Sequence, residues 1–153
     1  MQAQLQGLLR ASSTNRRTPT TLRAIHYGIE NPSGSRYADV LGGNGYANIL
    51  NGGDGNDMLI GGIGSDNLLG GNGIDTASYA NAPSAVVANL SGSSVNTNDA
   101  AGDIYSLIDN IVGTNYGDEV AGNSTANALS GGGGDDVMAG NAGNILSMER
   151  PGR

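Results

Sequence analysis

The sequence contains no Cys, Trp or Phe, and His26 is its single His among 153 residues. Without Cys there is no disulfide and no thiolate metal site, and one His excludes zinc sites built from several histidines. Leu, Ile and Val together number 30, close to the level at which a chain buries too little apolar surface to fold alone. We therefore expect something other than a large hydrophobic core to hold the fold.

The sequence lacks the motifs of several classes of enzyme. Neither the H-E-x-x-H motif of metalloproteases nor the G-x-S-x-G motif of serine hydrolases occurs. No apolar run approaches the roughly 18 residues of a membrane-spanning helix, and the apolar part of Met1–Arg10 is too short and interrupted for an N-terminal signal peptide. We expect no catalysis by this chain and no membrane span.

Positive charge is scarce outside the two ends of the chain. All seven basic residues are Arg, and the segment from Glu30 to Glu149 holds all fourteen acidic residues with only Arg36 among them. The net charge of -7 disfavours nucleic acid and anionic membranes as partners. An acidic body without basic side chains needs a counter-ion, and metal cations are the natural candidate.

Glycine is abundant, with 27 residues, and recurs every nine residues. Five units run without a gap over 34–78 and four more over 113–148, and each unit begins with Gly. Position 6 is Asp or Asn in eight of the nine units, and position 8 is mostly aliphatic. A longer repeat places Ile29–Gly64 on Ile108–Gly143 with 16 identities in 36 positions. The chain is therefore a little under two copies of one module.

Each unit divides into a turn and a short strand. Its first six residues, rich in Gly, Asn and Asp, favour a turn, whereas the last three form a strand with one inward aliphatic side chain. Two units make one flattened coil of a solenoid, so that unit i stacks on unit i+2. The side chains at position 6 then lie at strand spacing, about 4.8 Å apart.

Stacked carboxylates repel each other unless a cation lies between them. Carboxylates and main-chain carbonyls offer oxygen ligands only, and calcium accepts six to eight of these in a loose geometry. We therefore predict calcium as the cofactor. The predicted ligands follow from the stacking: Asp39, Asp57 and Asp75 on one edge, Asn48 and Asp66 on the opposite edge, and Asp118 with Asp136 in the second array.

The repeats GGDGNDMLI and GGIGSDNLL resemble the nonapeptide G-G-x-G-x-D-x-U-x of the RTX (haemolysin-type) calcium-binding proteins. The resemblance covers roughly residues 25–144. It implies an all-β, right-handed parallel β-roll, folding that depends on calcium, and type I export to the cell exterior. The motif does not identify the protein to which such arrays are attached, because they accompany toxins, proteases, lipases, alginate epimerases and adhesins.

We divide the chain into a disordered Arg-rich tail (1–24), a first array (25–78), a spacer (79–112), a second, decaying array (113–145) and a disordered C-terminal tail (146–153). Within the spacer, Val86–Leu90 alternates like a strand. The spacing of Ile104, Leu107, Ile108 and Ile111 instead suits a short helix, and the spacer aspartates suit capping or turns better than metal binding. Both tails are consistent either with a foreign or frame-shifted junction or with a natural disordered extension.

Two functions of different class remain open from the sequence. The first is an extracellular calcium-binding module with a structural or interaction role and a modest affinity of about 10⁻⁴–10⁻³ M. The second is a piece of a secreted enzyme or toxin, such as a polysaccharide-modifying enzyme, a protease, a lipase or a haemolysin. For either function, the sequence does not indicate which protein or polysaccharide the chain binds.

Overall fold

The structure is a computed structural model that describes residues 25–26, 28, 30–141 and 145–148. The predicted N-terminal tail and most of the C-terminal tail lie outside these residues. The described chain forms short β-strands with two 3-10 helices: β1 (Ile25–His26), β2 (Val40–Gly42), β3 (Ile49–Asp54), β4 (Met58–Ile60), β5 (Asn67–Asn72), β6 (Thr76–Ser78), β7 (Val87–Asn89), η1 (Ser93–Val95), η2 (Asn98–Ala100), β8 (Ile104–Ser106), β9 (Asn110–Val112), β10 (Glu119–Ala121), β11 (Asn127–Ser130), β12 (Val137–Ala139) and β13 (Ile145–Met148).

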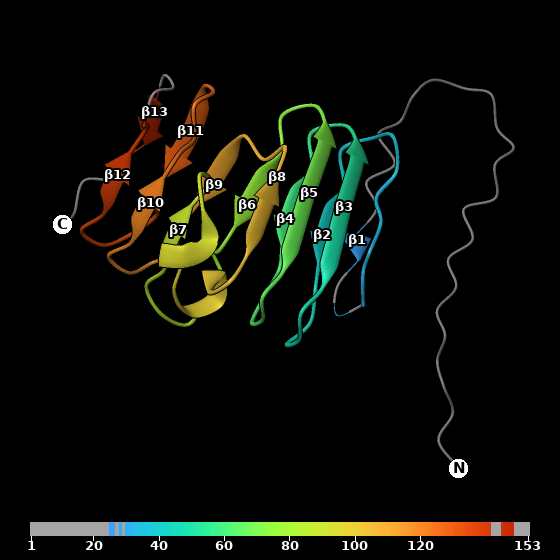
Figure 1. The fold of residues 1–153 in the computed structure, drawn as a ribbon, viewed down its shortest axis with the longest axis horizontal. Helices are drawn as coiled ribbons and strands as arrows, with labels where there is room; N and C mark the ends of the chain where they lie inside the picture. The colour runs from blue at the N-terminus through green and yellow to red at the C-terminus, as the bar shows by residue number, and fades with distance from the viewer. Residues whose placement is uncertain (1–24, 27, 29, 142–144, 149–153) are drawn as a thin grey trace, which may run out of the picture.

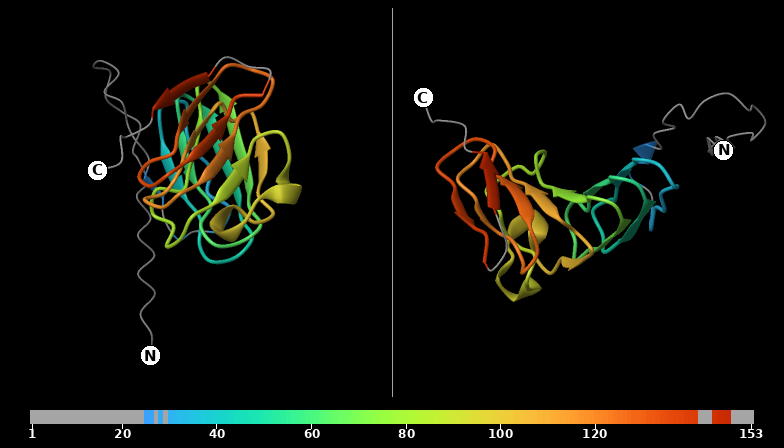
Figure 2. Two further views of the ribbon diagram at one scale, coloured as in Figure 1. Left: turned by 90° about the vertical axis from the view of Figure 1, so that its left-hand side faces the viewer. Right: turned by 90° about the horizontal axis from the view of Figure 1, so that it is seen from above.

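The strands wind into a two-layered solenoid, and all pairings between them are parallel. One layer is a seven-stranded sheet in the order β1-β2-β4-β6-β9-β11-β13. The facing layer consists of two three-stranded sheets, β3-β5-β8 and β7-β10-β12 (Figure 1). The side views in Figure 2 show turns joining the layers at both edges. The predicted all-β parallel β-roll is confirmed.

The nonapeptide period sets the register between neighbouring coils. Val40 lies beside Met58 and Leu41 beside Leu59, so a strand within the first array pairs with the strand two nonapeptide units further along the chain. In β4 the central residue is buried and its two neighbours are only partly covered. Strands β7, β9 and β10 show the same pattern with one buried central residue, as the position-8 pattern predicts.

The core is a narrow stack between the two layers. Leu41, Leu59 and Leu129 line it from the seven-stranded sheet, and Leu50 and Leu68 from the facing layer, all at most 1% exposed. Burial of a Leu side chain contributes about 1.5–3 kcal/mol. Because each coil contributes few such residues, contacts along the turns must supply much of the remaining stability.

The spacer continues the solenoid in an enlarged coil. Strand β7 confirms the strand expected at Val86–Leu90, and the chain between the paired strands β6 and β9 is longer than two nonapeptide units. The short helix predicted from the apolar spacing at Ile104–Ile111 is wrong, because this segment forms β8 and the start of β9. Ile104 and Leu107 are exposed, so the four apolar residues do not share one buried face. A positive φ of 54° at Leu107 also interrupts any helix there.

The second copy of the duplicated module occupies the opposite layer from the first. Strand β2 lies in the seven-stranded sheet, whereas its equivalent in the second copy, β10, lies in the facing layer. The enlarged spacer coil therefore changes the phase of the repeats by half a coil. At the far end, β13 pairs with β11 and overlaps the predicted C-terminal tail. None of the helices in the described part is long and apolar enough to cross a membrane.

Candidate metal centre

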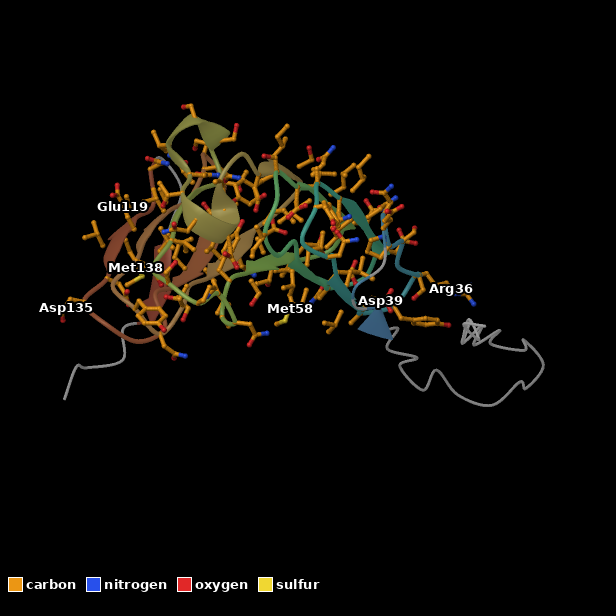
Figure 3. The ribbon with its side chains drawn as sticks, turned by 90° about the horizontal axis from the view of Figure 1, so that it is seen from below. Arg36, Asp39, Met58, Glu119, Asp135 and Met138 are labelled. Carbon is orange, nitrogen blue, oxygen red and sulfur yellow. The ribbon has the colours of Figure 1, made fainter. Side chains whose placement is uncertain are left out.

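The turns of the solenoid bring the position-6 side chains to its two edges, each just before a strand. There the side chain points inward, and five of the predicted ligands are at most 2% exposed: Asp39, Asp57, Asp66, Asp75 and Asp118. Asn48 is also buried, and Asp136 is half-buried. Figure 3 shows Asp39 near the N-terminal end of the solenoid, with Asp135, the exposed neighbour of Asp136, at the opposite end.

These side chains stack in the predicted pairs. The main-chain N–H of Asp39 donates to Oδ1 of Asp57 at 2.8 Å, and the N–H of Asp57 donates to Oδ1 of Asp75 at 2.8 Å. The same bond joins Asn48 to Asp66, and Asp118 to Asp136. One carboxylate oxygen of each acceptor therefore holds the preceding coil in register. The predicted stacking is confirmed, whereas metal binding by these residues stays a prediction.

The stacked side chains form three rows along the solenoid. The first ladder contains Asp39, Asp57, Asp75, Asp109 and Asn127. The second ladder contains Asn48, Asp66 and Asp103, and the third joins Val86, Asp118 and Asp136.

Asp103 and Asp109 belong to ladders although the sequence favoured capping or turn roles for them. In the spacer, hydrogen-bonded rungs are separated by more residues than two repeat units contain. The nonapeptide period therefore did not predict that Asp103 and Asp109 join the ladders. A weaker signal was present. Asp103 stands two residues before Tyr105, and Asp109 stands two residues before Ile111. Tyr105 and Ile111 line the interior as position 8 does in a repeat.

Three carboxylates keep an oxygen without a hydrogen-bond partner. The Oδ2 atoms of Asp57, Asp66 and Asp75 are buried and accept no hydrogen bond. Leaving a buried carboxylate oxygen unsatisfied is costly, since the lost hydration of a charged group is not replaced. These oxygens are hard anionic donors of the kind that calcium prefers. The residues present therefore fit a calcium ion.

Main-chain carbonyls border the same space. A methyl group added to Gly52 would clash with both the Gly70 carbonyl oxygen and Oδ2 of Asp57, so these two oxygens face one small region that only Gly leaves open. Among the described residues, no three His, Cys, Asp or Glu side chains gather around one point. A calcium ion at this edge would therefore take main-chain carbonyl oxygens among its ligands, as the sequence suggested.

Other turns close on their own position-6 side chain. Oδ2 of Asp118 accepts hydrogen bonds from the N–H of Thr114 at 2.6 Å and from its hydroxyl at 3.0 Å. Ser35 closes on Oδ2 of Asp39 in the same way, at 2.5 and 2.9 Å. The amide N–H of Asn44 donates to Oδ1 of Asn48 at 2.7 Å. In these three turns, residues of the turn itself satisfy the oxygen that would face a metal.

The second residue of the unit separates the two kinds of turn. The turns with an unsatisfied Oδ2 have Gly at this position, and Gly53, Gly62 and Gly71 have φ angles of 99°, 92° and 107°. Side chains rarely adopt this conformation, so Gly is required there. The turns that close on themselves have Ser, Thr or Asn instead. We call these two kinds open turns and closed turns.

Burial changes the acidity of the carboxyl groups in the open turns. Burial raises the pKa of Asp57 above its ordinary value, and the charges of Asp39 and Asp54 add to the effect. The pKa of Asp75 is raised by burial and by the charges of Asp57 and Asp109. Burial also raises the pKa of Asp66. A main-chain hydrogen bond to each carboxylate partly opposes these shifts.

The last rung of the second ladder has a different partner. The Tyr79 hydroxyl donates to Oδ2 of Asp103 at 2.7 Å, and the Tyr79 and Tyr105 hydroxyls lie 2.5 Å apart. Asp103 is fully buried, and burial raises its pKa to about 7. The Tyr79 hydroxyl thus satisfies Oδ2 of Asp103, whereas the equivalent Oδ2 of Asp66 has no donor.

Two segments of the chain match a model of a known family. The family model described as RTX calcium-binding nonapeptide repeat (4 copies) matches residues 42–77 and 112–144. The matched segments contain the open turns that end at Asp57, Asp66 and Asp75. No curated protein matches the chain.

Proposed function

Because this chain belongs to the RTX calcium-binding nonapeptide repeat proteins, we propose that it is a module that folds when it binds calcium outside the cell. Its role is structural or interactive, without catalysis. The observation that carries the proposal is the set of buried, unsatisfied Oδ2 atoms of Asp57, Asp66 and Asp75. These atoms lie in the open turns, each of which has Gly at positions 1, 2 and 4 and Asp at position 6, as in the repeat consensus.

The calcium ion supplies positive charge between carboxylates and accepts several oxygen ligands at once. Asp57 and Asp75 would hold calcium at the edge of the first ladder, and Asp66 would hold a separate ion at the edge of the second ladder, each together with carbonyls of the glycine turns. Asp39, Asp118, Asp136 and Asn48 remain proposed ligands. Of these, the first two and Asn48 must first exchange the hydrogen bonds that close their turns.

Binding and folding are coupled in this proposal, because the ligands come from successive coils and meet only in the solenoid. Folding without a cation brings carboxylates of like charge to strand spacing and buries them. A ligand that binds only the folded state at 100 times its Kd stabilises that state by about 2.7 kcal/mol. For a chain with so narrow a core, a shift of this size decides whether it folds.

The extracellular location follows from the same reasoning. An affinity of about 10⁻⁴–10⁻³ M, as in extracellular calcium modules, keeps the chain unfolded in the cytosol and lets it fold after export. The alternative is that the repeats belong to a secreted enzyme or toxin and assist its folding or its approach to a substrate. Nothing in the described turns favours one parent class over another.

Far-UV circular dichroism during a calcium titration of EDTA-treated protein tests the proposal, with magnesium as the control. We expect a change from coil to β signal with calcium and little change with magnesium. A spectrum that stays disordered up to about 10 mM calcium, or one equally β-rich in EDTA, would contradict calcium-dependent folding.

A further inference from the structure

The first ladder continues beyond the last repeat of the first array. The N–H of Asp75 donates to Oδ2 of Asp109 at 2.9 Å, much as the N–H of Asp57 donates to Oδ1 of Asp75. The parallel register also continues, with Thr76 beside Asn110. The spacer therefore supplies a rung of the ladder although its turn is not a glycine-rich nonapeptide.

A carbonyl of the spacer takes the place that a repeat glycine has elsewhere. Beside Gly52, the neighbouring oxygens are the Gly70 carbonyl and Oδ2 of Asp57. Beside Gly70, they are the Leu107 carbonyl and Oδ2 of Asp75. The same pair of oxygen types therefore borders Gly70 at the junction between the array and the spacer.

The carboxylate at this junction has an unused oxygen. Asp75 is 0% exposed, and its Oδ2 has no hydrogen-bond partner. Its turn is open, since Gly71 has a φ of 107°. The adjacent Asp109 brings a second carboxylate and is only half-buried. An orphaned buried oxygen, a second carboxylate and a carbonyl together make an oxygen-only donor set.

The next steps along the ladders lack this combination. Beyond Asp109, the side-chain amide of Asn127 donates to the Asp109 carbonyl at 2.7 Å, so a hydrogen bond joins these rungs. On the other edge, the Tyr79 hydroxyl occupies Oδ2 of Asp103. Oδ2 of Asp66 is also unsatisfied, but both oxygens of the carboxylate beside it, Asp103, are hydrogen-bonded.

We propose that Asp75, Asp109 and the main-chain carbonyl of Leu107 bind a calcium ion that joins the first array to the spacer. This inference rests on the proposed function. Asp109 and Leu107 lie outside the segments that match the repeat family. The site thus extends calcium binding to residues of the spacer and ties the β6–β9 pairing, which connects the two arrays, to the ion.

The test measures the number of calcium ions bound by the full chain, by equilibrium dialysis, together with the circular dichroism titration. Asp109→Asn keeps an oxygen that accepts from the Asp75 N–H but removes the charge. Glu119→Gln removes one charge from an exposed strand residue and is the matched control. We expect Asp109→Asn to bind one ion fewer than wild type and Glu119→Gln to bind the same number.

The outcomes separate this inference from the proposed function. If wild type binds calcium and Asp109→Asn binds as many ions, the junction site is wrong and the calcium module stands. If wild type binds no calcium, both are wrong. If Asp109→Asn does not fold in calcium, anomalous diffraction from wild-type crystals grown with calcium decides. A peak between Asp75 and Asp109 supports the site, and its absence with ions elsewhere overturns it.

Discussion

Tyr79 donates a hydrogen bond of 2.7 Å to Oδ2 of Asp103 at the edge of the solenoid where Asp66, one rung earlier, keeps its own Oδ2 without a partner. The N–H of Asp66 donates to the other oxygen of Asp103 at 2.8 Å, so the two carboxylates are neighbours in one ladder. The spacer therefore stabilises its carboxylate with a side chain, whereas the open turns of the repeats leave this oxygen without a donor. Part of the solenoid thus has its own hydrogen-bond partners without a metal.

Tyr79→Phe is expected to destabilise the folded protein in saturating calcium. The variant leaves Oδ2 of the buried Asp103 without a donor, and the loss of one partner of a buried polar pair costs about 1–3 kcal/mol. Urea unfolding measures the effect. Tyr46→Phe is the control, because Tyr46 is 77% exposed. Equal unfolding midpoints for Tyr79→Phe and wild type would show that the bond contributes nothing to stability.

The repeats made the fold and most of the candidate site predictable. The nine-residue period places Asp39, Asp57 and Asp75 in one row because equal offsets stack equal positions, and the structure has this row. The period fails in the spacer, where the offsets depend on turns of irregular length. The nine-residue period therefore predicted neither the place of Asp109 in the first ladder nor the hydrogen bond from Tyr79 to Asp103.

The difference between open and closed turns was also beyond the repeat pattern. Ser35 and Thr114 occupy a position where the consensus has Gly, but only the structure shows that both donate to the carboxylate four residues further on. The repeat pattern predicts that Asp39 and Asp57 are ligands in the same row, although the residues around Asp39 follow the consensus less regularly. Their surroundings differ in the hydrogen bonds that reach Oδ2.

Thr114→Gly is expected to make the second array more dependent on calcium. The variant removes the hydroxyl that bonds both carboxylate oxygens of Asp118 at 3.0 Å and introduces a residue that freely adopts a positive φ. We expect a loss of about 1 kcal/mol of unfolding free energy at low calcium and a smaller loss at saturating calcium.

Thermal unfolding at several calcium concentrations tests this expectation. Asn115→Gly is the matched control, because Asn115 is the exposed neighbour in the same turn. An equal loss of stability for Thr114→Gly at every calcium concentration would mean that its turn does not compete with metal binding.

Leu59→Ala is expected to abolish folding or to cost about 2–5 kcal/mol in saturating calcium. Leu59 is 0% exposed and lies between Leu41 and Ala77 in the stack of the seven-stranded sheet. Met58→Ala is the control on the same strand, since Met58 is only partly covered (Figure 3). Equal urea midpoints for the two variants would contradict a core that depends on one side chain per strand.

The pH dependence of folding should reverse in sign when calcium is added. Burial raises the pKa values of Asp57, Asp66 and Asp75, so without calcium the folded state binds protons more readily than the unfolded chain. Its stability then increases as the pH falls toward these raised values and is lost as the pH rises through them. With calcium, protons compete with the ion for the same carboxylates, so acid weakens binding.

We therefore expect lowering the pH from about 7.5 toward the ordinary aspartate value, about 3.9, to strengthen the β signal in EDTA and to raise the calcium concentration at the folding midpoint. Circular dichroism at constant ionic strength measures both quantities. The triple variant Asp57→Asn, Asp66→Asn and Asp75→Asn is the control, because it keeps the hydrogen-bond acceptors but no longer titrates at these positions. If its calcium midpoint moves with pH as much as that of wild type, the titrating ligands lie outside the open turns.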